Sequence, residues 1–144
     1  MPTTFTNNWK KILDKLESTI RTEFKNALPT YKGFIDESAG SQYLRIIPSS
    51  SNLLEYNLTS ETREFNIDMI LHIKSANIKE TALDHIFRLV SRLESLVVDN
   101  ISMTLADNSN LFNCRIESTS FDSTNSEEHI VTFDFRGTHM SNIS

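Results

Sequence analysis

The residue types that most often do chemistry in proteins are sparse in this chain and form no familiar motif. Its four histidines, the usual general bases and metal ligands, are His72, His85, His129 and His139. None of them belongs to an HExxH motif or stands at zinc-ligand spacing from a carboxylate. We interpret each as a structural or surface histidine, and we expect no metal and no cofactor.

The single cysteine does not define a nucleophile. Cys114 alternates with Phe112 and Ile116, which predicts a small buried side chain on a strand. One cysteine excludes a disulfide within the chain, and a nucleophilic role would need a histidine that only the fold could place beside it.

The remaining signals of catalysis are also missing. Acidic pairs occur at Asp36-Glu37 and Glu127-Glu128, but both lie in loop-like segments. General acid–base catalysis needs two carboxylates in different environments inside a cleft. With 3 glycines the chain has no glycine-rich phosphate loop, and it has no GxSxG motif. We therefore expect no enzymatic activity.

Size and composition indicate one ordinary globular domain, residues 1–144. The hydrophobic fraction is 38% and the charged fraction 23%. No apolar run approaches the roughly 18 residues of a membrane span, and the N-terminus does not read as a signal peptide. We expect an intracellular product, or one that leaves the cell by another route, with no membrane partner. The net charge of −5 and the scattered Lys and Arg disfavour tight binding to nucleic acid.

Two amphipathic helices are predicted by apolar residues at helical spacing. The first covers about residues 7–28 and ends before Pro29. Its stripe is Trp9, Ile12, Leu13, Leu16, Ile20, Phe24 and Leu28. The second begins at an Asn77 cap with Glu80 three residues on. Its predicted buried stripe is Leu83, Ile86, Phe87, Val90, Leu93 and Val97.

Four principal strands are predicted, at residues 42–47, 62–74, 111–121 and 128–137, and residues 101–105 form a further short alternation. The strand at 62–74 has the clearest alternation, with Phe65, Ile67, Met69, Leu71 and Ile73 on one face. Pro48 is expected to halt the first strand, and residues 49–61 to form a long loop. Residues 31–41 read as another loop, and residues 138–144 as a flexible tail.

The predicted fold class is α+β, a mostly antiparallel sheet of about four strands packed by two helices in the order α-β-β-α-β-β. Such an open sheet leaves two edges of unpaired backbone groups. Because the longest strand carries few blocking charges, pairing with other copies in a closed ring would satisfy these edges. The alternative is a monomer whose edges are covered by residues 49–61 and by the tail.

This order of elements resembles the tail terminator family of long-tailed bacteriophages, also called tail-completion or neck proteins. The resemblance spans nearly the whole chain and is carried by the segments YLRIIP (43–48), TREFNID (62–68) and IVTFDFR (130–136). It implies a structural virion protein of the tail or neck, assembled in the host cytoplasm, that forms a homo-hexameric ring. That ring would cap the tail tube protein and meet the head–tail connector or stopper protein, while DNA passes through the lumen without specific binding.

The family has no catalytic residues to transfer, so the resemblance implies surfaces rather than an active site. Candidates for a lumen or intersubunit face are Glu64, Asn66 and Asp68, because acidic and neutral polar side chains do not hold phosphate. Candidates for axial contacts lie in two predicted loops. They are Ser49, Ser50, Ser51 and Asn52 in the first, and Asn125 and Glu127 in the second.

Two other functions remain open from the sequence. A stopper or adaptor within the connector would belong to the same structural class. A small α+β module that binds a metabolite or a peptide, unrelated to phage, would belong to another. The lack of a glycine-rich or polar-convergent pocket motif counts against the module.

Overall fold

A computed structural model describes residues 7–33, 42–74, 80–125 and 128–142 of the chain. Within these ranges two helices and a short 3₁₀ turn accompany one six-stranded sheet. The elements are α1 (Asn8–Phe24), the 3₁₀ turn Lys25–Ala27, β1 (Thr30–Lys32), β2 (Gln42–Tyr56), β3 (Ser60–Lys74), α2 (Glu80–Asp99), β4 (Met103–Thr104), β5 (Asn110–Asn125) and β6 (Glu128–Asn142). The spatial order of the strands is β1-β2-β3-β6-β5-β4.

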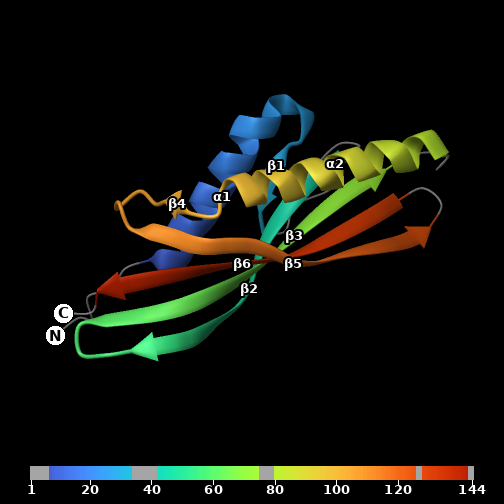
Figure 1. The fold of residues 1–144 in the computed structure, drawn as a ribbon. Coiled ribbons are helices and arrows are strands. Elements are labelled where there is room, and N and C mark those ends of the chain that lie inside the picture. The colour runs from blue at the N-terminus through green and yellow to red at the C-terminus, as the bar shows by residue number, and fades with distance from the viewer. Residues whose placement is uncertain (1–6, 34–41, 75–79, 126–127, 143–144) are drawn as a thin grey trace.

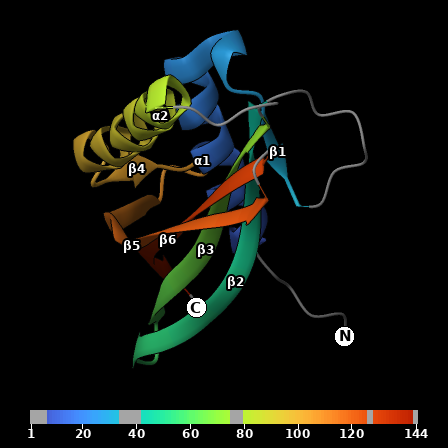
Figure 2. The same cartoon turned by 90° about the vertical axis from the view of Figure 1, so that its right-hand side faces the viewer.

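Both helices pack on the same face of the sheet, which twists and curls beneath them (Figures 1 and 2). The opposite face carries no helix among the described residues. The core lies between the helices and the sheet, where Phe133, Phe135 and Leu16 are at most 1% exposed. The rim of this core is closed by Trp9 of α1, whose ring meets the Phe65 ring edge-on at 4.8 Å between centroids.

Helix α1 begins and ends where its sequence directs. The Asn7 side chain accepts a hydrogen bond from the Lys10 backbone N–H at 3.1 Å, which caps the first turn. Its buried residues, Ile12, Leu16, Ile20 and Phe24, recur every four positions. The helix was predicted over residues 7–28, and its last turn is the 3₁₀ turn before Pro29.

The alternation predicted for β3 is confirmed. Its odd-numbered residues from Phe65 to Ile73 are buried on the helix side. The even-numbered side chains of Glu64, Asn66 and Asp68 therefore point to the face without helices.

The predicted four-strand fold class is wrong, because the sheet has six strands and is mixed. The order of elements is α-β-β-β-α-β-β-β, and β1 pairs parallel with β2 through Thr30 with Leu44 and Lys32 with Ile46. A three-residue strand has too little sequence to show a period. β1 exists because β2, distant along the chain, supplies its partners. β4 is a two-residue strand within the short alternation predicted at residues 101–105.

The predicted stop at Pro48 is wrong as well, since β2 continues through it to Tyr56. Opposite β3 the pairing shifts register between Pro48 and Ser50 and again between Leu53 and Glu55. Beyond Ile46, β2 has no β1 residue on its outer side, so the missing N–H of Pro48 breaks no ladder there. What was predicted to be a loop at residues 49–61 is therefore the outer half of a long hairpin.

Two further expectations are corrected. The tail predicted from Thr138 onward is the last part of β6 as far as Asn142, and His139 is 2% exposed. In α2, the predicted buried residues Leu83 and Phe87 are 38% and 50% exposed, because they flank the stripe that reaches the core. The Asn77 cap lies outside the described residues.

Strand β3 also differs from its expected role at an edge. It pairs with β2 on one side and with β6 on the other along nearly its whole length. It therefore has no free backbone edge to offer another copy. The outer edges belong instead to β1 and β2 on one side and to β4 and β5 on the other.

Gly137 should prove essential for packing in the core. An added Cβ would meet three Leu111 side-chain carbons at 2.9 to 3.0 Å, and Leu111 is fully buried in the core. We expect Gly137→Ala to lower the free energy of unfolding by about 1–3 kcal/mol. Chemical denaturation of Gly137→Ala, Leu111→Ala and the double variant measures this. The double variant should lose less than the sum of the two single losses, and strict additivity would contradict the proposed clash.

Candidate functional site

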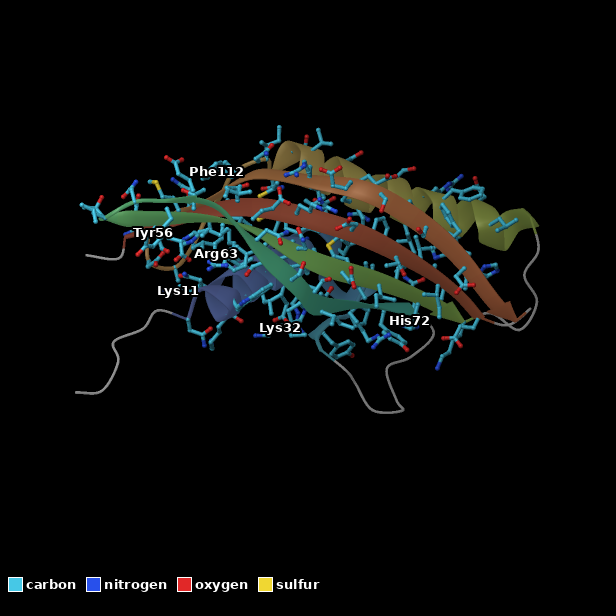
Figure 3. All side chains as sticks on the ribbon, turned by 90° about the horizontal axis from the view of Figure 1, so that it is seen from below. Lys11, Lys32, Tyr56, Arg63, His72 and Phe112 are labelled. Atoms are coloured by element: carbon cyan, nitrogen blue, oxygen red, sulfur yellow. The ribbon has the colours of Figure 1, made fainter. Side chains whose placement is uncertain are left out.

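The face of the sheet without helices brings the predicted lumen residues together. Glu64, Asn66 and Asp68 stand in successive rows at the centre of the sheet, since β3 has neighbours on both sides. Asn66 pairs across the strands with Ser50 and with Arg136. Figure 3 views the sheet from this side, with the helices behind the strands.

Two arginines from other strands surround Glu64. An Nη2 atom of Arg115 lies 2.9 Å from one Glu64 carboxylate oxygen, and Arg136 lies 3.6 Å from the other. The hydrogen bond that Arg115 donates to the Glu64 carboxylate raises the pKa of its guanidinium further. Arg115 also pairs with Glu117, and Arg136 pairs with Asp134 at 3.0 Å. Each cation of this cluster therefore already has carboxylate partners within the chain.

Asp68 lies in a different environment from Glu64. It stands directly opposite Asp134 across the β3–β6 ladder. Partial burial, and next the charge of Asp134, raise the pKa of the Asp68 carboxyl above its usual 3.8. Two like charges side by side are unfavourable. Asp68 therefore binds a proton more tightly in the folded chain than a free carboxyl does in water.

Asn66 connects these two sites and leaves one polar atom unused. Its amide nitrogen donates to the Ser50 hydroxyl at 2.8 Å. Its Oδ1 is buried and has no hydrogen-bond partner within the described part of the chain. The central row of the face therefore keeps one unsatisfied acceptor.

The far end of this face is closed by an aromatic cluster around His72. The imidazole stacks on the Tyr43 ring at 4.6 Å and accepts a hydrogen bond from Arg45 Nε at 2.9 Å. Its other nitrogen lies 3.3 Å from Glu128. Burial lowers the pKa of His72 more than Glu128 raises it, so the neutral ring is favoured. His72 is therefore a buried side chain, and both of its ring nitrogens have partners.

The predicted axial residues are not brought together in a loop. Ser49, Ser50, Ser51 and Asn52 lie within β2, and Asn125 is the last residue of β5. Glu127 lies outside the described residues. The actual turn between β2 and β3 is Asn57 to Thr59, where the Asn57 side chain accepts hydrogen bonds from the backbone N–H groups of Thr59 and Ser60 at 2.9 and 2.8 Å.

Sequence reasoning missed the exposed apolar residues at this end of the hairpin. Leu53, Leu54, Tyr56 and Leu58 are 50%, 56%, 64% and 93% exposed. The sequence did contain a sign of this exposed group, because four large apolar residues occur within the six positions 53–58 of an otherwise polar segment. They cluster because β2 extends beyond the part of the sheet that the helices cover (Figure 1).

The cysteine and the potential metal ligands are the remaining side chains with possible chemistry. Burial raises the pKa of the Cys114 thiol to about 12, so the reactive thiolate is disfavoured. Among the described residues no group of His, Cys, Asp and Glu side chains is arranged to hold a metal ion. Over the same residues, neither helix has the length and hydropathy to cross a bilayer.

Comparison with solved structures places this fold beside a virion component. The chain is similar to a chain of the virion of a native gene transfer agent particle, with a TM-score of 0.52 and 9% identity, over 92% of this chain and 91% of that one. It is also similar to a solved chain known by its sequence identifier alone, with a TM-score of 0.57 and 15% identity over 96% and 99% of the two chains. No protein-family model and no curated protein matches the sequence. These similarities show a fold that this chain shares with both solved chains.

The raised pKa of Asp68 gives a pH-dependent prediction. Because the folded chain binds this proton more tightly than the unfolded chain, the group favours folding at acidic pH and opposes it above the folded pKa. Asp68→Asn should therefore raise the free energy of unfolding at pH 7. The gain should shrink as the pH falls through the raised folded pKa and be lost by about pH 3.8, the usual pKa of the group. Urea denaturation across pH measures the effect, with Asp122→Asn at an exposed carboxylate as the matched control. Equal effects of the two variants would contradict the assignment.

Proposed function

We propose that this chain is a structural protein of a phage-like virion that acts as a tail terminator. It assembles into a ring that caps the tail tube and joins it to the head connector. The observation that carries the proposal is the fold shared with a virion chain over 92% of this chain and 91% of that one. The polar, helix-free face and the unpaired sheet edges support it.

The helix-free face suits the wall of a DNA channel. Arg115 and Arg136 are both paired with carboxylates, so phosphate would have to displace Glu64 to reach either of them. A wall of neutralised charges lets DNA slide past. Unpaired cations would bind the phosphates, release the counterions condensed on the DNA and so hold it in place. In this arrangement the two helices lie on the outside of the ring.

The ends of the strands suit the axial contacts. The β2–β3 turn and the β5–β6 connection lie at opposite ends of the sheet, because Tyr56 pairs with Glu61 and Asn125 with Glu128. A ring whose strands run along its axis presents one connection to the tail tube and the other to the connector. The proposed partners are identical copies of the chain, the tail tube protein and the connector protein. The proposal includes no enzymatic activity.

Electron microscopy of the purified protein, alone and mixed with tail tubes, tests the proposal. Rings with a central hole, seated at tube ends, are the expected result. Rings that bind connector particles and ignore tubes would assign a stopper or adaptor role instead. A protein that forms no ring under either condition would overturn the proposal.

Leu58 is the residue we expect to contact the axial partner. It is 93% exposed on a turn that the Asn57 side chain holds closed. Leu58→Ser should leave the ring intact and reduce the fraction of capped tubes several-fold, counted in micrographs. Thr59→Ser on the same turn is the control. Unchanged capping by Leu58→Ser would remove the β2–β3 turn from the contact.

Glu64 should prevent the face from binding DNA. Replacing it leaves Arg115 and Arg136 with less negative charge, so Glu64→Gln should bind duplex DNA more tightly than the parent chain. The added binding should weaken as salt is raised. Fluorescence anisotropy with labelled DNA measures this, and Glu61→Gln, which affects the separate Arg63 pair, is the control. Parent and Glu64→Gln chains of equal DNA affinity would contradict the role of Glu64.

A further inference from the structure

We propose that neighbouring copies dock head to tail, with the β1–β2 edge of one copy against the β5–α2 edge of the next. This inference rests on the proposed ring and specifies its interface. It differs from the sheet extension expected through the longest strand, which is paired on both sides. Four features of the described residues support it, namely the edges, two apolar surfaces, the charges and the strand register.

The two outer edges of the sheet are covered over only short stretches. β1 pairs with β2 from Leu44 to Ile46, and β4 pairs with β5 at Asn110 and Leu111. Beyond these stretches, no described strand pairs with the outer side of β2 or of β5. Register shifts interrupt both strands, so a long new ladder is disfavoured. Side chains must therefore supply most of the contact.

The first edge carries an exposed apolar group, which we call the edge patch: Leu53, Leu54 and Tyr56. These side chains are 50%, 56% and 64% exposed. Leu54 occupies the register shift between Leu53 and Glu55 and has no partner position on β3. Tyr56 lies at the outer end of the hairpin (Figure 3).

The opposite edge carries a second exposed apolar group, which we call the helix flank: Phe87, Val98 and Ile101 with Phe121 of β5. They are between 50% and 66% exposed. Phe87 and Phe121 meet edge-on at 5.9 Å between ring centroids. Beside Val98 and Ile101 an open hollow of about 340 Å³ is lined by Val97, Cys114 and Ile116, and also by the polar residues Glu94, Asn113 and Arg115. The apolar part of its wall can accept an inserted leucine.

The charges of the two edges are unlike at the level of β1. There, Lys32 of β1, Arg21 of α1 and Lys25 of the 3₁₀ turn outnumber Asp14 and Glu17, which pair with Lys32 and Arg21. Glu55 lies farther along β2, within the edge patch. Arg21 reaches the edge directly, donating to the Thr30 carbonyl at 2.7 Å. On the second edge, Glu94, Glu117 and Asp122 outnumber Arg115. Complementary charges steer two different surfaces together and oppose contact of either surface with itself.

The register places matching features at the same level on both edges. Leu53 is level with Leu111 through Arg63 and His139, so the edge patch stands at the end of the sheet where Ile101 bonds to Cys114. Lys32 is level with Thr119 through Ile46, Met69 and Phe133, three residues from Asp122. A neighbour rotated about an axis along the strands would therefore bring the edge patch to Val98 and Ile101, and cation to anion. Phe87 and Phe121 are level with Leu44 through Val131 and Leu71, so they would meet the stretch of the edge that β1 covers. Figure 3 shows Lys32 and Phe112 at opposite edges.

Contact between two different surfaces on each copy is heterologous. Such contacts do not give twofold dimers, and they form a ring when the rotation between neighbours closes. This yields a mixing experiment. Leu54→Glu disables the edge patch, and Val98→Glu disables the helix flank. Ser95→Glu is the matched control, since Ser95 is exposed on the same helix and lies about 60° around the helix axis from Val98. All three positions are exposed, and circular dichroism checks their folding.

Sedimentation velocity, with and without tail tubes, is the measurement. We expect rings from the parent chain and from Ser95→Glu, and monomers from Leu54→Glu and from Val98→Glu. An equal mixture of the two disabled variants should give dimers, because each retains the surface that the other lacks.

Each other outcome overturns the inference. Rings from either disabled variant would leave the proposed function intact and refute this interface. Dimers of one variant alone would indicate a contact between like surfaces, and a mixture that remains monomeric would show that the two surfaces do not meet. A parent chain without rings, with or without tubes, would overturn the proposed function together with the interface.

Discussion

Pairing of β3 on both of its sides is the constraint on which the rest of the structure depends. Because β2 and β6 occupy its two edges, β3 must lie at the centre of the sheet. Its alternation then orients the whole sheet, with Phe65 to Ile73 beneath the helices and Glu64 to His72 on the other face. A slip of one residue would exchange these faces and bury carboxylates in the core. The register of β3 therefore fixes both the core and the candidate functional surface.

The charged cluster around Glu64 is organised more for orientation than for stability. The Glu64 side chain is 15% exposed, and those of its partners Arg115 and Arg136 are about one-third exposed. Ion pairs in such positions contribute little net free energy, on the order of 1 kcal/mol or less. Their effect is to hold two guanidinium groups against the sheet and to cancel their charge. The channel wall that we propose would need such cancellation to stay polar without attracting phosphate.

Local patterns predicted the helices and the central strands because a period of 3.6 or of 2 needs no distant partner. Glu64, Asn66 and Asp68 could be assigned to one face for the same reason. Arg115 and Arg136 could not be assigned as their partners, because the β3–β6–β5 register joins residues more than fifty positions apart. The continuation of β2 past Pro48 could not be predicted for the same reason. It depends on pairing with the first half of β3, which the sequence of β2 alone does not show. Phe87 was wrongly predicted to be buried. A periodic apolar stripe shows which side of a helix faces the core, but not how far around the helix the core extends.

The same topology makes the two edges of the molecule unequal. β1 and β4 are the outermost strands, yet they cover opposite ends of the sheet, since β1 pairs near Leu44 and β4 near Leu111. These positions lie at different levels of the strand register, so the exposed stretches of β2 and β5 are also offset from each other. A protein whose edges matched could satisfy them by pairing like with like across a twofold axis. Here each edge differs from the other in length, charge and apolar content, so the efficient way to cover both is to place unlike edges together in every contact. Repetition of one such contact by rotation leaves no edge uncovered once the circle closes.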